Sequence, residues 1–310
     1  MTDLALIQTS LLAWFASNAR DLPWRHTRDP YRILVSEIML QQTQVDRVIP
    51  KYRAFLDAFP SLGDLADAPT AEVIRLWAGL GYNRRAVNLQ RAAQAVRDKY
   101  DGQFPRTVAE LQSLPGIGPY TAGAVACFAF EQDVAFMDTN IRRVLRRALL
   151  GPDDQEPAPS DRQLLELGAA LVPPGQGWAW NQAVMELGAL ICTSGSPTCQ
   201  RCPISAGCRA YAARRAESQP PTEIALGAPV RPARRVAERK EQPYKGSRRW
   251  QRGRIIDALR QHAALTLAHL GSLVKPDYDH HQDSEWLREL VNGLARDGLL
   301  VLNGNEVRLP

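Results

Sequence analysis

Four of the five cysteines lie within one stretch of 17 residues, CTSGSPTCQRCPISAGC, at Cys192, Cys199, Cys202 and Cys208. The N-terminus carries no export signal, so the clustered cysteines indicate a metal site rather than disulfides. Structural zinc sites usually combine two close Cys-x-x-Cys pairs, whereas this stretch has one such pair, flanked by gaps of six and five residues. The compact spacing favours four thiolates around a single [4Fe-4S] cluster, with zinc or no metal as the alternatives. The fold must therefore bring these four side chains together.

Helical hydrophobic patterning dominates residues 1–215, and alternating strand patterns are absent from them. No stretch is long and apolar enough to span a membrane, and the N-terminal segment resembles an ordinary amphipathic helix, so we expect a cytoplasmic protein. Cys127, alone in an apolar run, is expected in the core. Pro, Gly and Asn signals separate the predicted helices. These helices are Leu4–Ala19, Tyr31–Phe59, Ala71–Leu76, Arg84–Lys99, Val108–Ser113, Thr121–Phe130, Ile141–Leu150, Asp161–Leu171 and Trp180–Cys192.

The composition changes after residue 215. From Arg209 to Arg254 the chain has 13 Lys or Arg and four Asp or Glu. Such a block favours a polyanionic partner, most simply nucleic acid, although a solvated linker would have the same composition. Gln219–Pro243 contains five prolines and no helical periodicity. We therefore predict a basic, proline-rich linker over residues 216–246.

Residues 247–310 are predicted to form a separate small domain. Helical patterns at Arg248–His262, Leu267–Val274 and Ser284–Asp297 precede LLVLNGNEVRL, in which Asn303-Gly304 signals a hairpin. Three helices and a two-stranded wing describe a winged-helix-like α+β domain. Its third helix is only weakly basic, so a clamp on the DNA backbone or a contact with another protein is favoured over reading of a groove.

A carboxylate interrupts the apolar run ILVSEIMLQQTQV. Glu37 lies between the apolar triplets Ile33–Val35 and Ile38–Leu40, in a helix that is apolar on most sides. Burial of a carboxylate there costs several kcal/mol unless it is paired, protonated or used in chemistry. A structural acid bound to backbone N–H groups or to an arginine is the alternative to a general acid, whose pKa burial would raise.

Two further strings contain candidate site residues. LPGIGPYTA places Gly116 and Gly118 directly before a helix N-terminus, where exposed N–H groups can bind a phosphate. The alternative is a plain turn between helices. In VAFMDTNIRRVLRR, Asp138 precedes a helix and is either a simple N-cap or a site carboxylate that the helix dipole keeps ionised. A buried acid and a fixed anion together suit acid–base chemistry with a cationic intermediate.

These strings occur together and in order with several others. Residues 20–208 resemble the catalytic domain of the MutY-type adenine DNA glycosylases, in the helix–hairpin–helix superfamily that includes endonuclease III. The resemblance implies a mostly α fold for residues 1–215, with a six-helix module (26–132), an iron–sulfur module (1–25 and 133–215), and a flipped adenine bound between them. The matching strings are RDLPWR (20–25), SEIMLQQTQV (36–45), GLGYNRRAVNL (79–89), LPGIGPYTAGAV (114–125), DTNIRRV (138–144), NQAVMELGALIC (181–192) and the four-cysteine loop.

The resemblance also implies a role for each matched residue. Glu37 protonates adenine N7, Asp138 stabilises the sugar cation at C1′, and Tyr120 and Asn140 orient them. The other implied contacts with the flipped base and the duplex are Trp24, Arg25 and Gln182 in the base pocket, Arg20 near the catalytic site, Leu40, Gln42 and Tyr82 as wedges, and Gln41, Thr43, Gly116 and Gly118 facing the DNA.

Two departures from related proteins shape the prediction. The lyase-competent endonuclease III branch has a lysine where this chain has Tyr120, so strand cleavage through a Schiff base is not expected. Residues 247–310 do not resemble the Nudix-like domain of many adenine glycosylases, and look instead like the winged-helix tail of a subgroup of bacterial MutY-type proteins.

We therefore predict a monomeric, monofunctional glycosylase, associated with a bacterial-type nucleoid. It would carry one [4Fe-4S] cluster and remove adenine opposite 8-oxoguanine or guanine in double-stranded DNA. The alternatives are a glycosylase for thymine or another mismatched base, and an iron–sulfur, winged-helix regulator that binds DNA without cutting it.

Overall fold

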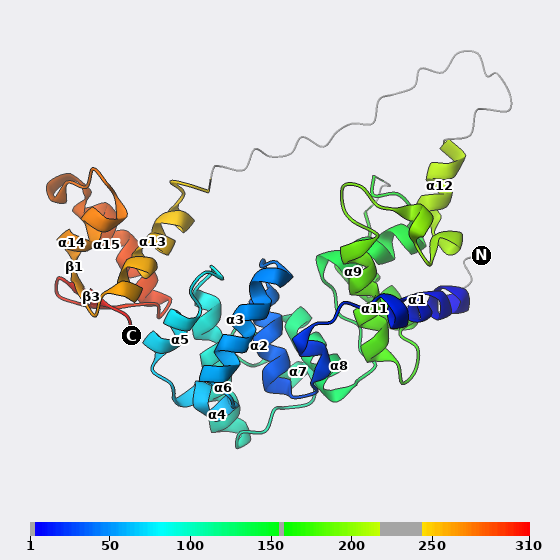
Figure 1. Ribbon diagram of the computed structural model, residues 1–310, viewed down its shortest axis with the longest axis horizontal. Coiled ribbons are helices and arrows are strands. Elements are labelled where there is room, and N and C mark those ends of the chain that lie inside the picture. The colour runs from blue at the N-terminus through cyan, green and yellow to red at the C-terminus, as the bar shows by residue number, and fades with distance from the viewer. Residues whose placement is uncertain (1–3, 155–157, 218–243) are drawn as a thin grey trace, which may run out of the picture. The chain divides into compact units, whose positions relative to one another are not determined.

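The computed structural model describes residues 4–154, 158–217 and 244–310, so the predicted linker Gln219–Pro243 lies outside the described residues. The described chain forms two compact units (Figure 1). Of the described residues, unit 1 contains 4–30, 106–109, 118–154 and 158–217, and unit 2 contains 31–105, 110–117 and 244–310. Among these residues no helix is long and apolar enough to cross a membrane.

In unit 1 the central helix is α11 (Gly177–Leu190), which packs against α1 (Leu4–Asn18), α8 (Pro119–Phe130) and α9 (Thr139–Leu145). Gly188 lets α9 come close, because a Cβ there would lie 2.7 Å from the Cβ of Asn140. The remaining elements of the unit are η1 (Pro23–His26), η2 (Arg146–Leu150, a π-turn), α10 (Asp161–Leu171), η3 (Cys199–Arg201), η4 (Ser205–Gly207) and α12 (Arg209–Glu217).

Unit 2 combines helices from two distant parts of the sequence. The first part contains α2 (Pro30–Leu40), α3 (Val45–Ala58), α4 (Leu62–Asp67), α5 (Thr70–Leu76), α6 (Arg84–Tyr100) and the last three residues of α7 (Val108–Gln112). The second contains α13 (Arg248–Gln261), α14 (Leu267–Val274), α15 (His280–Arg296) and the strands β1 (Leu265–Thr266), β2 (Val301–Asn303) and β3 (Glu306–Arg308). The strands form an antiparallel sheet in the order β1-β3-β2, with Leu302 opposite Val307.

The structure confirms the predicted fold class, a mostly α protein with a small α+β domain at its C-terminal end. It differs from the predicted elements at Tyr31–Phe59, which is not one helix. Gln41–Gln44 separate α2 from α3, and Gln42 adopts a left-handed φ of 56°. The sequence patterns also missed α4, whose capping box of Ser61 and Asp64 was a usable signal. They missed α12 and the two-residue strand β1 as well.

The C-terminal domain, residues 244–310, shares its hydrophobic core with the helices beside it in unit 2. Ile74 of α5 and Val87 of α6 belong to the same buried cluster as Leu259 of α13 and Leu290 of α15. Arg260 of α13 donates to the carbonyl of Ile74 at 3.0 Å. These contacts bury apolar surface that would otherwise face water, and they attach the domain to α5 and α6 (Figure 1).

We expect Ile74→Ala to lower the free energy of unfolding by about 2–4 kcal/mol, because it opens a cavity in this shared core. Urea unfolding followed by circular dichroism measures the change. Leu165→Ala, at a side chain that is 40% exposed, is the control and should cost less than about 0.5 kcal/mol. Equal losses of unfolding free energy in the two variants would show that the Ile74 side chain does not stabilise the shared core.

Candidate active site and metal centre

Glu37 lies in α2 with its side chain buried, and the residue is only 4% exposed. Its helix neighbours Ile33, Val35 and Ile38 are also buried, as the apolar pattern predicted. Glu37 is therefore a carboxyl group buried in an apolar helix, at the position that the sequence pattern indicated.

The Gln41–Gln44 turn, which includes most of the Gln-Gln-Thr string, is held by Arg85 of α6. The guanidinium donates to the carbonyls of Ile38 (2.7 Å) and Met39 (3.1 Å) at the end of α2, and to the carbonyl of Gln41. It also donates to the Thr43 hydroxyl at 3.2 Å. Burial lowers the pKa of Arg85 to about 10, although Tyr82 opposes this change. Leu40 closes the helix, and Gln42 extends into solvent.

The loop before α6 places Tyr82 at the surface. Arg85 donates to the carbonyls of Leu80 (3.0 Å) and Gly81 (3.2 Å), and its guanidinium lies 5.6 Å from the centre of the Tyr82 ring. Tyr82 has a positive φ of 45° and remains 46% exposed. The loop thus presents an aromatic side chain to solvent on a fixed backbone. Arg85 lies in the GLGYNRRAVNL string but was not predicted as a site residue, because its role depends on contacts with residues 38–43, far away along the chain.

The glycine pair before α8 serves two different needs. Gly116 has a φ of 76°, and a Cβ there would lie 2.6 Å from the Cβ of Asn88. Gly118 is the N-cap of α8, with an ordinary φ of −87° and open space where a Cβ would be. Gly116 is therefore required by the turn, whereas Gly118 leaves room for a ligand at the helix N-terminus. Tyr120 follows in α8, with its ring edge-on to Phe136 at 5.5 Å.

Asp138 is the N-cap of α9, as predicted, and its carboxylate is held from two sides. Oδ1 accepts from the Ile141 N–H at 2.6 Å, and Oδ2 accepts from the side-chain amide of Asn140 at 3.0 Å. The Asn140 Oδ1 in turn accepts from Arg143 at 2.7 Å. Arg143 also donates to the carbonyl of Cys192 at 2.6 Å. Both oxygens of the carboxylate are thus fixed by partners on α9 itself.

A second network connects four residues of unit 1 around a buried glutamate that sequence reasoning missed. Glu186 of α11 accepts from Arg20 (2.8 Å) and Arg25 (2.9 Å), and Arg25 also donates to Gln182 at 3.0 Å. Burial opposes ionisation of Glu186, but the hydrogen bonds from Arg20 and Arg25 outweigh it and lower its pKa to about 2. Trp24 is buried beside Arg25 in η1. The signal that identified Glu37, a carboxylate in an apolar helix, was present in VMELGAL too.

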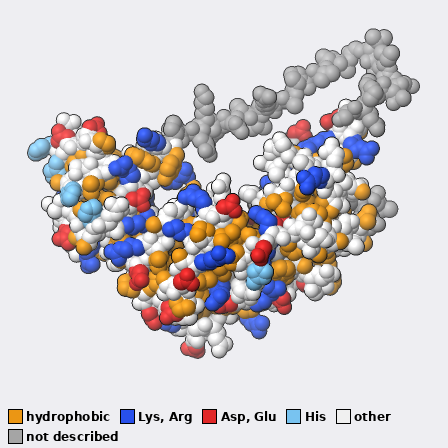
Figure 2. All heavy atoms as spheres, viewed as in Figure 1, with side chains coloured by type: hydrophobic (Ala, Val, Ile, Leu, Met, Phe, Trp, Pro, Cys, Tyr) orange, Lys and Arg blue, Asp and Glu red, His pale blue; other side chains and the backbone are white. Residues whose placement is uncertain are grey.

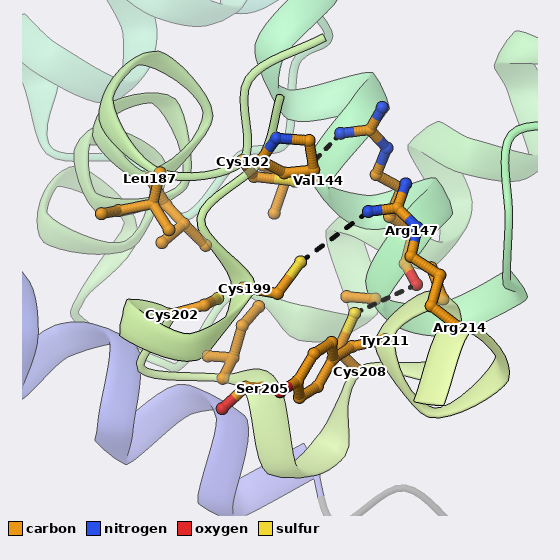
Figure 3. A pocket seen from close by; sticks show the side chains of 15 residues that line it. Val144, Arg147, Leu187, Cys192, Cys199, Cys202, Ser205, Cys208, Tyr211 and Arg214 are labelled. Atoms are coloured by element: carbon orange, nitrogen blue, oxygen red, sulfur yellow. Dashed lines mark hydrogen bonds between the residues drawn. The ribbon is translucent and has the colours of Figure 1, made fainter. Parts of the chain in front are cut away.

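The four clustered cysteines line one pocket of unit 1 (Figure 3). Cys192 follows α11, Cys199 begins the turn η3, Cys202 follows that turn, and Cys208 precedes α12. Arg147 donates to the Cys192 sulfur at 3.6 Å, and Arg214 donates to the Cys199 sulfur at 3.9 Å. Burial raises the pKa of the Cys202 thiol to about 12, and the neighbouring thiols add to this increase. The separate Cys127 is fully buried in α8, as predicted.

Within the described ranges, no three His, Cys, Asp or Glu side chains are arranged to hold a single metal ion. The cysteine sulfurs instead surround a pocket whose other walls are mostly apolar, with two arginines as donors. In an iron–sulfur cube each thiolate binds its own iron, so the sulfurs need not meet at one point. Four thiols in an apolar pocket with cationic donors are a set of residues that an iron–sulfur cluster can bind.

The predicted site residues fall into two groups by unit. Unit 2 contains Glu37 and the duplex-facing candidates Leu40, Gln41, Gln42, Thr43, Tyr82 and Gly116. Unit 1 contains Asp138, Tyr120, Asn140, Arg20, Trp24, Arg25, Gln182 and Gly118, with Cys192, Cys199, Cys202 and Cys208. Direct contacts join Asp138 to Asn140 and Arg25 to Gln182.

Comparison with known proteins places these features in context. Residues 35–170 match the HhH-GPD superfamily of base excision DNA repair proteins. The chain is 42% identical to the adenine DNA glycosylase of Mycolicibacterium smegmatis, over 97% of both chains. It is 43% identical to the human adenine DNA glycosylase over 68% of this chain, which spans only 40% of the human protein. Among solved structures, a thermostable thymine-DNA glycosylase superposes with a TM-score of 0.63 and 34% identity, covering 68% of this chain and 97% of that one.

The low pKa of Glu186 predicts a specific pH dependence of stability. Its fall from 4.5 to about 2 stabilises the fold by about 3 kcal/mol above pH 4.5, and this contribution is lost as the pH falls from 4.5 towards 2. Glu186→Gln should therefore lower the free energy of unfolding by about that amount at pH 7, with a smaller difference from the native protein at pH 3.

Urea unfolding at the two pH values measures this difference. Glu166→Gln is the matched control, because Glu166 forms only an exposed ion pair with Arg162 and should contribute less than about 0.5 kcal/mol. A Glu186→Gln loss that is the same at both pH values would contradict the assignment.

Proposed function

The chain belongs to the MutY-type adenine DNA glycosylases of the helix–hairpin–helix superfamily, and on this premise we propose that it removes adenine from DNA by hydrolysis. The observation that carries the proposal is the carboxylate of Asp138, held by Ile141 and Asn140 at the N-terminus of α9. A fixed anion of this kind can stabilise positive charge that develops on a sugar, without having to reorganise during the reaction.

In the proposed reaction Glu37 donates a proton to N7 of the flipped adenine. The C1′–N9 bond then breaks and its electron pair moves onto the adenine ring. Asp138 stabilises the cation at C1′ until a water molecule adds there and loses a proton to solvent, from which Glu37 regains the proton that it donated. The products are free adenine and an abasic site. Asn140 keeps the Asp138 carboxylate in one orientation. Tyr120 stands where a lyase would need an amine, so the strand remains intact.

The proposed substrate is duplex DNA in which adenine is mispaired with 8-oxoguanine or guanine, bound by a monomer. Two exposed side chains on constrained backbones, Gln42 and Tyr82, support a surface that enters a duplex beside a flipped base. Arg25 and Gln182, joined by a hydrogen bond, supply polar groups for the base pocket. A DNA substrate implies the nucleoid as the place of action.

We also propose that Cys192, Cys199, Cys202 and Cys208 hold one [4Fe-4S] cluster. Their shared pocket and the donors Arg147 and Arg214 support this assignment, because cationic donors offset the negative charge of a thiolate-bound cluster. When bound, the cluster supplies a structural link between four points of the loop. The side chain of Arg147 also donates to the Thr193 carbonyl at 2.7 Å, which positions the start of the loop.

The structural similarity to a thymine-DNA glycosylase makes thymine removal the second candidate activity. A DNA-binding regulator that releases no base is the third candidate. One assay separates all three. Duplexes with A opposite 8-oxoguanine, A opposite G and T opposite G are incubated with the protein and then treated with alkali. Cleavage at A supports the proposal, cleavage at T supports the thymine enzyme, and binding without cleavage supports the regulator.

We expect Glu37→Gln to lower single-turnover excision of adenine by at least ~10²-fold, while duplex binding and thermal stability are retained. The loss follows from removing the proton donor without changing the shape of the side chain. Without alkali, the native protein should leave the strand uncut. Glu72→Gln, at an exposed position of α5, is the control and should keep the native rate. A native rate in Glu37→Gln would refute the assignment of the acid.

Purified protein should be brown, with broad visible absorbance and about four irons per chain by metal analysis. Cys199→Ser should lower the iron content, because it removes one thiolate from the pocket. Cys127→Ala removes the buried cysteine outside the loop and should leave the iron content unchanged. A colourless native protein with one zinc per chain would overturn the cluster assignment.

A further inference from the structure

Arg249 lies between two exposed tyrosines of unit 2. It is the second residue of α13, and its guanidinium donates to the Tyr82 hydroxyl at 2.6 Å. The same guanidinium lies 5.3 Å from the Tyr82 ring centre and 4.9 Å from that of Tyr244. The two tyrosines are 46% and 54% exposed. A residue of the C-terminal domain is therefore in direct contact with a candidate DNA wedge of the family domain.

These three residues line a groove of unit 2. The groove is lined by six arginines, one of which is Arg249, and by two aspartates. The aspartates are already paired, Asp297 with Arg252 and Asp257 with Arg260. Among the residues that the structure describes, no carboxylate pairs with Arg249, which is exposed. On the face shown in Figure 2, Lys and Arg side chains lie interspersed with hydrophobic ones. The groove thus combines excess positive charge with aromatic surface.

The position of Arg249 relative to Tyr82 is fixed by the core beneath it. The domain that carries α13 shares buried side chains with α5 and α6, and Arg260 of the same helix donates to the Asn83 side chain at 2.8 Å. Asn83 directly follows Tyr82. The Arg85 guanidinium also lies 5.6 Å from the centre of the Tyr82 ring, so the ring has an arginine from each part of the unit within 6 Å. Such preorganisation lowers the entropy cost of binding a ligand here.

We propose that Arg249, positioned by Tyr82, binds a backbone phosphate of duplex DNA, so that the C-terminal domain extends the DNA-binding surface beside the wedge. Arg249 donates to a tyrosine hydroxyl but pairs with no carboxylate among the described residues. Such a guanidinium suits a phosphate because its planar fork can donate two hydrogen bonds to the oxygens. The flanking tyrosine faces suit nucleobases or sugars next to that phosphate. Contact with a phosphate carries no sequence information, so the effect should be the same for damaged and undamaged duplexes.

This inference rests on the proposed DNA-directed function, but its test does not require base excision. Affinity for an undamaged duplex is measured by fluorescence anisotropy over a series of salt concentrations. Arg249→Ala should reduce the slope of log K against log salt by about 0.9 and weaken binding about tenfold near 0.1 M salt, because one phosphate contact is lost. Arg249→Lys should keep the slope, because the charge is retained.

Arg248→Ala is the matched control. Arg248 is the neighbouring residue with the same charge, but it forms an ion pair with Glu289 at 2.7 Å and should leave the slope unchanged. In a Tyr82→Phe background, the loss caused by Arg249→Ala should shrink, because the hydroxyl that orients Arg249 is absent. An equal loss in both backgrounds would refute the positioning by Tyr82.

An unchanged slope in Arg249→Ala, with its melting temperature intact, would overturn the phosphate contact. Tighter binding by that variant would also overturn it, since Arg249 would then restrain Tyr82 rather than bind DNA. The proposed enzymatic function fails separately, through the absence of base release by the native protein. A slope change without base release would support the phosphate contact and remove only the enzymatic proposal.

Discussion

The burial of Arg85 is the constraint on which the candidate DNA-facing surface of unit 2 depends. Its guanidinium binds carbonyls at the end of α2, in the Gln41–Gln44 turn and in the loop before α6, and so joins three segments. Desolvation lowers its pKa to about 10, and its Nε lacks a hydrogen-bond partner among the described residues, so the arrangement has a cost. The many carbonyl acceptors offset that cost. Gln42 and Tyr82 can therefore remain exposed while their backbones are fixed.

Unit 1 uses arginines in a comparable way around α9 and η2. Arg143 and Arg147, one helical turn apart, bind the carbonyl and the sulfur of Cys192 respectively. The same helix begins with Asp138, whose carboxylate reaches Arg143 through Asn140. The start of the cysteine loop and the candidate cation-stabilising group are thus both bound by residues of α9 and η2. A change in the loop can affect the orientation of Asp138 through three hydrogen bonds, from Cys192 to Arg143, from Arg143 to Asn140 and from Asn140 to Asp138.

The C-terminal domain is joined to the helices of the family domain through a shared core and a direct side-chain contact. Its helices contribute to one hydrophobic core with α5 and α6, and Arg249 reaches Tyr82 directly. Removing the domain would expose Ile74 and Val87 to water, so a truncation would mix a loss of stability with any loss of DNA contacts. Point substitutions at Arg248 and Arg249 separate the two effects, because both side chains are exposed.

Local patterns were sufficient to predict the burial of Glu37, the N-cap at Asp138, the cysteine loop and most of the helices, since each depends on neighbours within a few residues. They were not sufficient for the break at Gln42, because the turn is stabilised by Arg85, 43 positions further along the chain. Two hydrogen bonds were missed for the same reason, the one between Arg20 and Glu186 and the one between Arg249 and Tyr82. A hydrogen bond across more than 150 residues leaves no periodic trace in the sequence, and only folding brings its two partners together.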